Sequence, residues 1–113
     1  MAGKWTFFEV GAGNDLHGGD YTKAAIRAVQ DAIHHSSLPV LKSRGIDPES
    51  MEVEVIIGAQ RPEKVDRAAV AAALPHGKAT VRVEKGGLDI GDTGFDDISV
   101  IANAAILVAI DLG

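Results

Sequence analysis

The sequence predicts a single α+β domain: a β-α-β-α-β-β sandwich in which two helices cover one face of a four-stranded mixed sheet. Two segments carry apolar residues at the three-to-four-residue spacing of an amphipathic helix. Short runs that alternate in polarity, or are rich in β-branched residues, precede and follow them, as strands do. The chain has 113 residues, which suits one domain spanning residues 1–113.

The first half of the chain predicts one strand, one glycine-rich loop and one helix. Residues 4–10 are mainly aromatic and β-branched, which favours a strand. Four glycines within residues 11–19 predict a loop with unusual backbone angles. A helix is expected over residues 20–35, with Asp20 as its N-cap, and residues 40–50 are expected to form a connector. The buried stripe of this helix is expected to consist of Ala24, Ala25, Ala28, Val29, Ala32 and Ile33.

The second half predicts a strand, a second helix and further strands. Alternation predicts strands over residues 51–57 and 79–84, and Pro62 suits the first position of the helix between them. A short extended piece is expected over residues 88–90. Residues 98–112 are numerous enough for a helix, but their β-branched side chains favour a strand. The buried stripe of the second helix is expected to consist of Val65, Ala68, Ala69, Ala72 and Ala73.

The predicted strand over residues 98–112 is apolar on both faces. Two helices on one side of the sheet leave the other side bare, so we expect further subunits to cover it. The expected assembly is a homo-oligomer, with a trimer favoured. Each helix is also expected to return the chain to a neighbouring strand through a right-handed crossover.

Composition disfavours several classes of function. The absence of cysteine excludes a disulfide framework, a thiolate zinc site and a cysteine nucleophile. A net charge of −5 without a basic run disfavours nucleic acid and anionic membranes as partners. No apolar run reaches the roughly 18 residues of a membrane span, and the N-terminus lacks the apolar region of a signal peptide. We therefore expect a cytoplasmic protein.

Two side chains are candidates for acid–base catalysis. His17 lies in the glycine-rich loop and has an ordinary pKa near neutrality, which suits proton transfer. The alternative role is that of a hydrogen-bonding surface residue. Glu9 stands near the end of an apolar strand, where its pKa can be raised. Pairing with Lys23 or Arg27 is the favoured alternative for Glu9.

Polar residues of the loop and of the first helical turns are candidates for ligand binding. Lys23 and Arg27 lie one turn apart and can clamp a carboxylate or phosphate, or simply form a solvated face. Asp15, His17 and Asp20 can hold a cation, although their spacing is not diagnostic of a metal site. Turn formation and helix capping are the alternative, so we predict no metal and no cofactor.

Three further polar residues stand at other strands. Gln60 and Arg61 follow the second strand, whose end is expected beside that of the first, so that Arg61 faces the same cleft. Asn103 interrupts an apolar strand, where a buried amide either meets a ligand or subunit or is satisfied within the core. The ligand-binding candidates are therefore Asn14, Asp15, Asp20, Lys23, Arg27, Gln60, Arg61 and Asn103.

The run Asn14–Ala25 (NDLHGGDYTKAA), continued by Arg27–Val29 and Ser37–Pro39, resembles a bacterial family of about this length that is conserved but hypothetical, with no settled activity. The element order is also similar to the chorismate-mutase-like group of small folds. That group includes the trimeric bacterial chorismate mutase and the deaminase-accessory (reactive imine) proteins. The resemblance implies small-molecule binding in clefts between subunits.

A fainter likeness is to one repeat of the ring-opening amidohydrolases of the cyanuric acid hydrolase and barbiturase type. The local match is a glycine-rich loop followed by Asp20-Tyr21-Thr22-Lys23. The repeats of those enzymes place a serine in a Ser-Gly-Gly turn and pair it with a lysine. Here the matching turn is Ile57-Gly58-Ala59-Gln60, and Glu9 stands where the lysine would. The serine–lysine mechanism is therefore not carried over.

These observations predict a small-molecule-binding protein, with two hypotheses for its role. In the first, it is an acid–base enzyme acting on a small polar metabolite, a cyclic amide or carboxylated compound, at a subunit-interface cleft. In the alternative, it is a non-catalytic metabolite-binding or assembly protein on the same scaffold.

Overall fold

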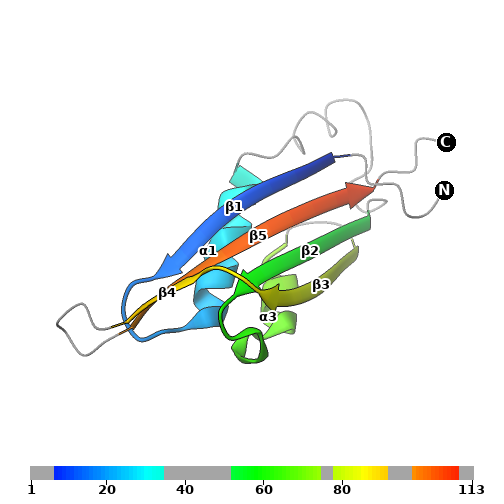
Figure 1. The fold of residues 1–113 in the computed structure, drawn as a ribbon. Helices are drawn as coiled ribbons and strands as arrows, with labels where there is room; N and C mark the ends of the chain where they lie inside the picture. Colours follow the sequence, from blue (N-terminus) through cyan, green and yellow to red (C-terminus); the bar gives the residue numbers. More distant parts are fainter. Residues whose placement is uncertain (1–6, 35–51, 75–77, 92–97, 110–113) are drawn as a thin grey trace.

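A five-stranded mixed sheet carries two helices on one of its faces (Figure 1). The structure is a computed structural model, and it describes residues 7–34, 52–74, 78–91 and 98–109. The predicted connector over residues 40–50 lies outside the described residues. The predicted α+β class is confirmed.

The elements follow the order β1 (Phe7–Asp15), α1 (Tyr21–His34), β2 (Glu52–Ala59), a 3₁₀ turn η2 (Pro62–Lys64), α3 (Arg67–Ala72), β3 (Lys78–Lys85), β4 (Leu88–Gly91) and β5 (Ile98–Ala109). The short extended piece predicted over residues 88–90 is β4, which makes five strands rather than four. The last segment is a strand, as its β-branched residues favour.

β5 is the central strand of the sheet. The strand order is β1-β5-β2-β3, and β4 pairs with the first residues of β5, beyond the point where β2 ends. β5 runs antiparallel to β1, β2 and β4, whereas β2 and β3 are parallel. The prediction that each helix links neighbouring strands is correct for α3 and wrong for α1. Because the long apolar β5 takes the central position, it lies between β1 and β2.

Gly11 and Gly13 lie within β1, so the predicted loop over residues 11–19 is wrong in its first half. A Cβ atom on Gly11 would lie 2.5 Å from the carbonyl oxygen of Ala28, and one on Gly13 would lie 2.5 Å from that of Ala24. These distances are far shorter than any ordinary carbon–oxygen contact. The two glycines therefore allow α1 to pack so closely on β1 that no side chain would fit between them.

α1 begins at the predicted residue. Asp20 caps it, because its Oδ1 accepts a hydrogen bond of 3.0 Å from the backbone N–H of Lys23. Gly18 and Gly19, which precede the cap, have positive φ angles of 94° and 63°, so the second half of the predicted loop is confirmed. The predicted stripe is confirmed apart from Ile33, which is half-buried, and Tyr21 is buried although it was not predicted to be. The buried residues are Tyr21, Ala24, Ala25, Ala28, Val29 and Ala32.

Two side chains of α1 satisfy backbone groups on the outer edge of β1. Asp31 Oδ2 accepts a hydrogen bond of 3.0 Å from the backbone N–H of Ala12. Arg27 Nη1 donates one of 2.7 Å to the backbone oxygen of Asn14. Unpaired groups on an edge strand are a template for pairing with another chain, so these bonds make that edge less available.

The second helix is shorter than predicted and presents a different face to the core. Asp66 caps α3, with its Oδ1 accepting a hydrogen bond of 3.2 Å from the backbone N–H of Ala69. The cap makes the helix begin anew after η2. As a result Val70 is buried while Ala68 and Ala72 are exposed, and the predicted alanine stripe is wrong.

The two faces of the sheet differ in cover. The helix-covered face buries alternate residues of β5, among them Val100 and Ile106. The opposite face, which we call the bare face, exposes large apolar side chains. Its most exposed members are Phe8 (67%), Val10 (60%), Leu88 (53%) and Ile90 (39%).

We expect Gly13→Ala to lower the free energy of unfolding by about 1–3 kcal/mol or more, because the added methyl group overlaps the backbone of α1. Urea unfolding followed by circular dichroism measures the change. Gly91→Ala is the matched control: its Cβ would meet nothing within 4 Å, so its effect should stay within about 0.5 kcal/mol. Equal effects of the two substitutions would contradict the close contact.

Candidate functional site

β1, β2 and β3 all finish at the same end of the sheet, where α1 begins (Figure 1). Open sheets of this kind commonly bind ligands beyond the carboxyl ends of their strands. The predicted polar residues of the loop and of the turn after β2 therefore lie at one end of the molecule. We call this region the polar end, defined by residues 15–23, 60–61 and 85–89.

Asp15, the last residue of β1, organises the first part of the polar end. It is only 5% exposed. Its Oδ2 accepts a hydrogen bond of 2.9 Å from the backbone N–H of Asp20, and its Oδ1 lies 3.8 Å from Lys23 Nζ and 3.9 Å from Arg27 Nη1. Both cations thus compensate a buried carboxylate, which is a more specific role than the solvated face or the ligand clamp predicted for them.

The two catalytic candidates are far apart. Glu9 pairs with Ile106 in the sheet and is half-buried, whereas His17 lies exposed in the loop after β1. The six residue-to-residue steps of extended strand from Glu9 to Asp15 alone span roughly 20 Å. The expected pairing of Glu9 with Lys23 or Arg27 is also absent, because both cations face Asp15 instead.

The carboxylates of the loop serve its backbone. Asp15 accepts from the N–H of Asp20, and Asp20 in turn accepts from that of Lys23. Turn formation and helix capping, the alternative to metal binding, are therefore what these two residues do. Within the described ranges, no three His, Cys, Asp or Glu side chains are grouped so that they could hold a metal ion.

The connection from β3 to β4 crosses the end of β2, and two predicted site residues fix it. Gln60 Nε2 donates hydrogen bonds of 2.9 Å and 3.2 Å to the carbonyl oxygens of Gly86 and Gly87. Asn103, which is exposed on the bare face rather than buried, accepts one of 3.1 Å at Oδ1 from the N–H of Gly87. Gly87 has a φ of 66°, and a Cβ there would overlap the carbonyl oxygen of Ile101.

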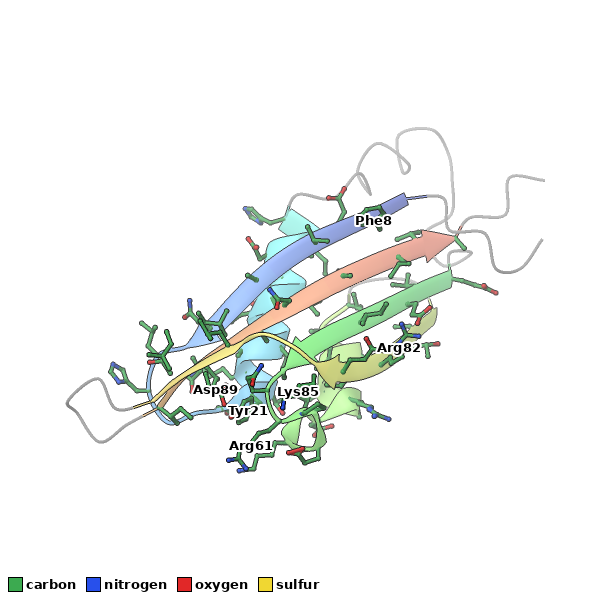
Figure 2. The ribbon with its side chains drawn as sticks, viewed as in Figure 1. Phe8, Tyr21, Arg61, Arg82, Lys85 and Asp89 are labelled. Atoms are coloured by element: carbon green, nitrogen blue, oxygen red, sulfur yellow. The ribbon has the colours of Figure 1, made fainter. Side chains whose placement is uncertain are left out.

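This crossing brings Asp89 of β4 against Tyr21, the first residue of α1 (Figure 2). Tyr21 is 6% exposed, and its hydroxyl donates a hydrogen bond to Asp89 Oδ2. Arg61, just after β2, lies near enough to lower the pKa of the same hydroxyl. Burial and then Asp89 raise the pKa of Tyr21, while Arg61 opposes them, so the hydroxyl remains the donor toward Asp89 at neutral pH.

The second oxygen of Asp89 has no hydrogen-bond partner among the described residues. Oδ1 is buried, and none of the described residues gives it a hydrogen bond. A buried acceptor without a donor costs about 1–3 kcal/mol, and native proteins seldom leave one without a reason. In the group Tyr21, Asp89 and Arg61, the hydrogen bonds within the described part of the protein therefore leave one buried polar atom unsatisfied, Asp89 Oδ1.

Sequence reasoning found Arg61 but missed Tyr21 and Asp89. Tyr21 looks like an ordinary first residue of an amphipathic helix, and Asp89 like a solvent-facing residue between Leu88 and Ile90. Their pairing depends on the crossing of β4 over the end of β2, which no local pattern predicts. The one sequence feature that pointed to this crossing was the pair of consecutive glycines before β4, Gly86 and Gly87.

A shallow apolar hollow lies on the bare face. Its volume is about 560 Å³, and small residues form most of its floor. The lining residues are Val10, Gly11, Ala12, Ile56, Gly58, Asn103, Ala104 and Ala105. Phe8 projects from the same face and is not part of the lining (Figure 2).

The fold and these surfaces define a small α+β protein with one helix-covered and one bare sheet face. The chain belongs to the conserved hypothetical protein family Lin0512_fam, whose model matches residues 5–108. The resemblance to a conserved hypothetical family is thereby confirmed.

A solved structure from Nostoc punctiforme, described as an FtsZ-like protein of unknown function, is similar with a TM-score of 0.84 and 38% sequence identity. The match covers 96% of each chain. No curated protein matches this chain. The faint likeness to the ring-opening amidohydrolases finds no support in these comparisons. Among the described residues, no helix is both long and apolar enough to span a membrane.

We expect the pKa of Tyr21, the single tyrosine of the chain, to be raised above its ordinary value of 10.0 in the folded protein, because of burial and the hydrogen bond to Asp89. A raised pKa means that the stability it confers is fully present below pH 10, the ordinary value, and is lost as the pH rises through the folded value. Tyrosinate absorbance during an alkaline titration reports on this residue alone. A midpoint at or below pH 10 would contradict the buried bond to Asp89.

Proposed function

We propose that this protein is a non-catalytic, homo-oligomeric binding protein, whose copies associate through the bare face and hold a small polar molecule at the polar end. The observation that carries the proposal is the exposure of Phe8, Val10 and Leu88 on a sheet face that neither of the described helices covers (Figure 1). A contiguous apolar surface of this kind usually marks an interface.

The size of the bare face suits a stable interface. The twelve residues of β5 extend about 40 Å, and the apolar part spans the width of roughly three strands spaced about 4.8 Å apart. The flat area is therefore ~600 Å², to which projecting side chains add. Specific protein interfaces bury about 800 Å² on each partner, which is a comparable area.

The shape of the bare face favours a second copy of this chain as its occupant. One copy offers both a projecting side chain, Phe8, and the hollow beside it. Phe8 of one copy can enter the hollow of the next, and such contacts close a ring where the rotation between copies allows it. We propose a trimer because the chorismate-mutase-like resemblance implies one.

Charged side chains of β2 and β3 border the apolar area of the bare face. The alternation of β2 and β3 places Glu54, Arg82 and Glu84 on the bare face. Arg82 lies 3.3 Å from Glu54 and 3.4 Å from Glu84, so these charges are already paired within the subunit. A polar rim beside an apolar centre is the usual anatomy of an interface.

The distance between Glu9 and His17 supports a non-catalytic role over the acid–base hypothesis. A general acid and a general base acting on one small molecule must both lie within hydrogen-bond reach of it. The extended strand between Glu9 and Asp15 keeps these two side chains at opposite ends of β1.

Phe8→Glu should dissociate the oligomer, because it places a charge at the centre of the proposed contact. Sedimentation velocity should show a shift from a multiple of 11.8 kDa to 11.8 kDa, with circular dichroism unchanged. Ala68→Glu is the control, since it adds the same charge to the exposed side of α3, on the helix-covered face. The proposal fails if both variants keep the mass of the unmodified protein.

A further inference from the structure

The two edges of the sheet differ in how their backbone is protected (Figure 1). On β1, the side chains of Asp31 and Arg27 bond to backbone groups of Ala12 and Asn14. β3 is the edge strand on the opposite side, and none of the side chains that the structure describes bonds to its backbone. Its outward N–H and C=O groups are therefore unpaired among the described residues, which makes them a template for a further strand.

β3 also lacks the features that commonly prevent pairing at a sheet edge. It is eight residues long, whereas the commonest strands have about five or six. It contains no proline, and its register with β2 runs from Lys78 to Lys85 without a bulge. A long and regular edge of this kind accepts a further strand through main-chain hydrogen bonds.

The charges of β3 indicate which strand would pair with it. Arg82 and Glu84 lie two positions apart, and so on the same face of the strand. They are 3.4 Å apart within one copy, yet their side chains remain 54% and 59% exposed, so each can meet a further partner. If two copies of β3 pair antiparallel with the register centred on Val83, Arg82 of each copy lies directly opposite Glu84 of the other.

We propose that the β3 edges of two copies of this chain pair antiparallel about Val83 and join their sheets into one. The arrangement is two-fold symmetric, so both opposite-charge pairs form in the same contact. Registers centred on Arg82 or on Glu84 are disfavoured, because they place like charges opposite each other. The contact uses the sheet edge and not the bare face, so it goes beyond the assembly proposed above and does not depend on it.

The edge contact should be weaker than the contact through the bare face. An isolated strand pair is marginally stable in water, and exposed ion pairs add little to it. We therefore expect the edge contact at high protein concentration, or where the bare-face assembly presents several edges at once. In dilute solution, Phe8→Glu should remain monomeric.

Disulfide cross-linking between two single-cysteine variants tests the register, because the chain itself has no cysteine. Arg82→Cys and Glu84→Cys are mixed in equal amounts in a glutathione redox buffer at high protein concentration. In the proposed register the two cysteines lie opposite each other, with about 4.5–5.5 Å between their Cα atoms, which a disulfide can bridge. Glu84 of the first variant and Arg82 of the second still form the other opposite-charge pair.

Each variant alone is the matched control. Two copies of Arg82→Cys place their cysteines about 8 Å apart between Cα atoms, beyond the reach of a disulfide, and so do two copies of Glu84→Cys. Random pairing gives the heterodimer about twice as often as either homodimer, whereas the proposed register should raise this ratio to about tenfold or more. Mass spectrometry separates the three products. Both substituted side chains are exposed, so the variants should fold, which circular dichroism checks.

The proposal is overturned if the mixed sample contains no heterodimer, or contains it only in the random ratio. An excess of one homodimer also overturns it, because this would indicate another register. The native mass of the unmodified protein is measured in parallel. A random ratio at a native mass above 11.8 kDa contradicts the edge contact alone, whereas a native mass of 11.8 kDa at every micromolar concentration contradicts the bare-face assembly.

Discussion

The contact between α1 and β1 is the constraint on which the rest of the structure depends. Gly11 and Gly13 leave the helix-facing side of β1 without side chains, and the alanines of α1 keep the facing side of the helix almost as bare. Backbone then lies against backbone, and little tolerance remains for sliding or rotation of the helix. That fixed position lets Arg27 and Asp31 reach the edge of β1 and sets Tyr21 at the polar end.

The same contact explains why the two faces of the sheet differ. Of the residues that the structure describes, one long helix lies on β1 and β5 and a short one near β3, both on the same side of the sheet (Figure 1). The other side keeps the apolar residues of strands that are buried in most proteins of this type. No further helix of the described residues covers it, and the proposed association of copies is based on this exposure.

Local sequence patterns were sufficient to predict the α+β fold class, the N-cap of α1 at Asp20 and the strand conformation of β5, because each of these depends on residues that are close in the sequence. They failed where distant segments meet. The glycines of β1 look like loop residues until α1 lies on them, and the position of β5 between β1 and β2 leaves no local trace. For the same reason Arg61 was found by its place after a strand, while Tyr21 and Asp89, which bond to each other, were not.

The most direct test of this account is the mass of the unmodified protein in solution across a range of micromolar concentrations, by sedimentation equilibrium. If copies cover the bare face, the mass should be a whole multiple of 11.8 kDa, three times that value if the ring is a trimer, and should fall only on dilution. A folded protein that stays at 11.8 kDa at every concentration would show that the bare face is stable in water, and would contradict the account.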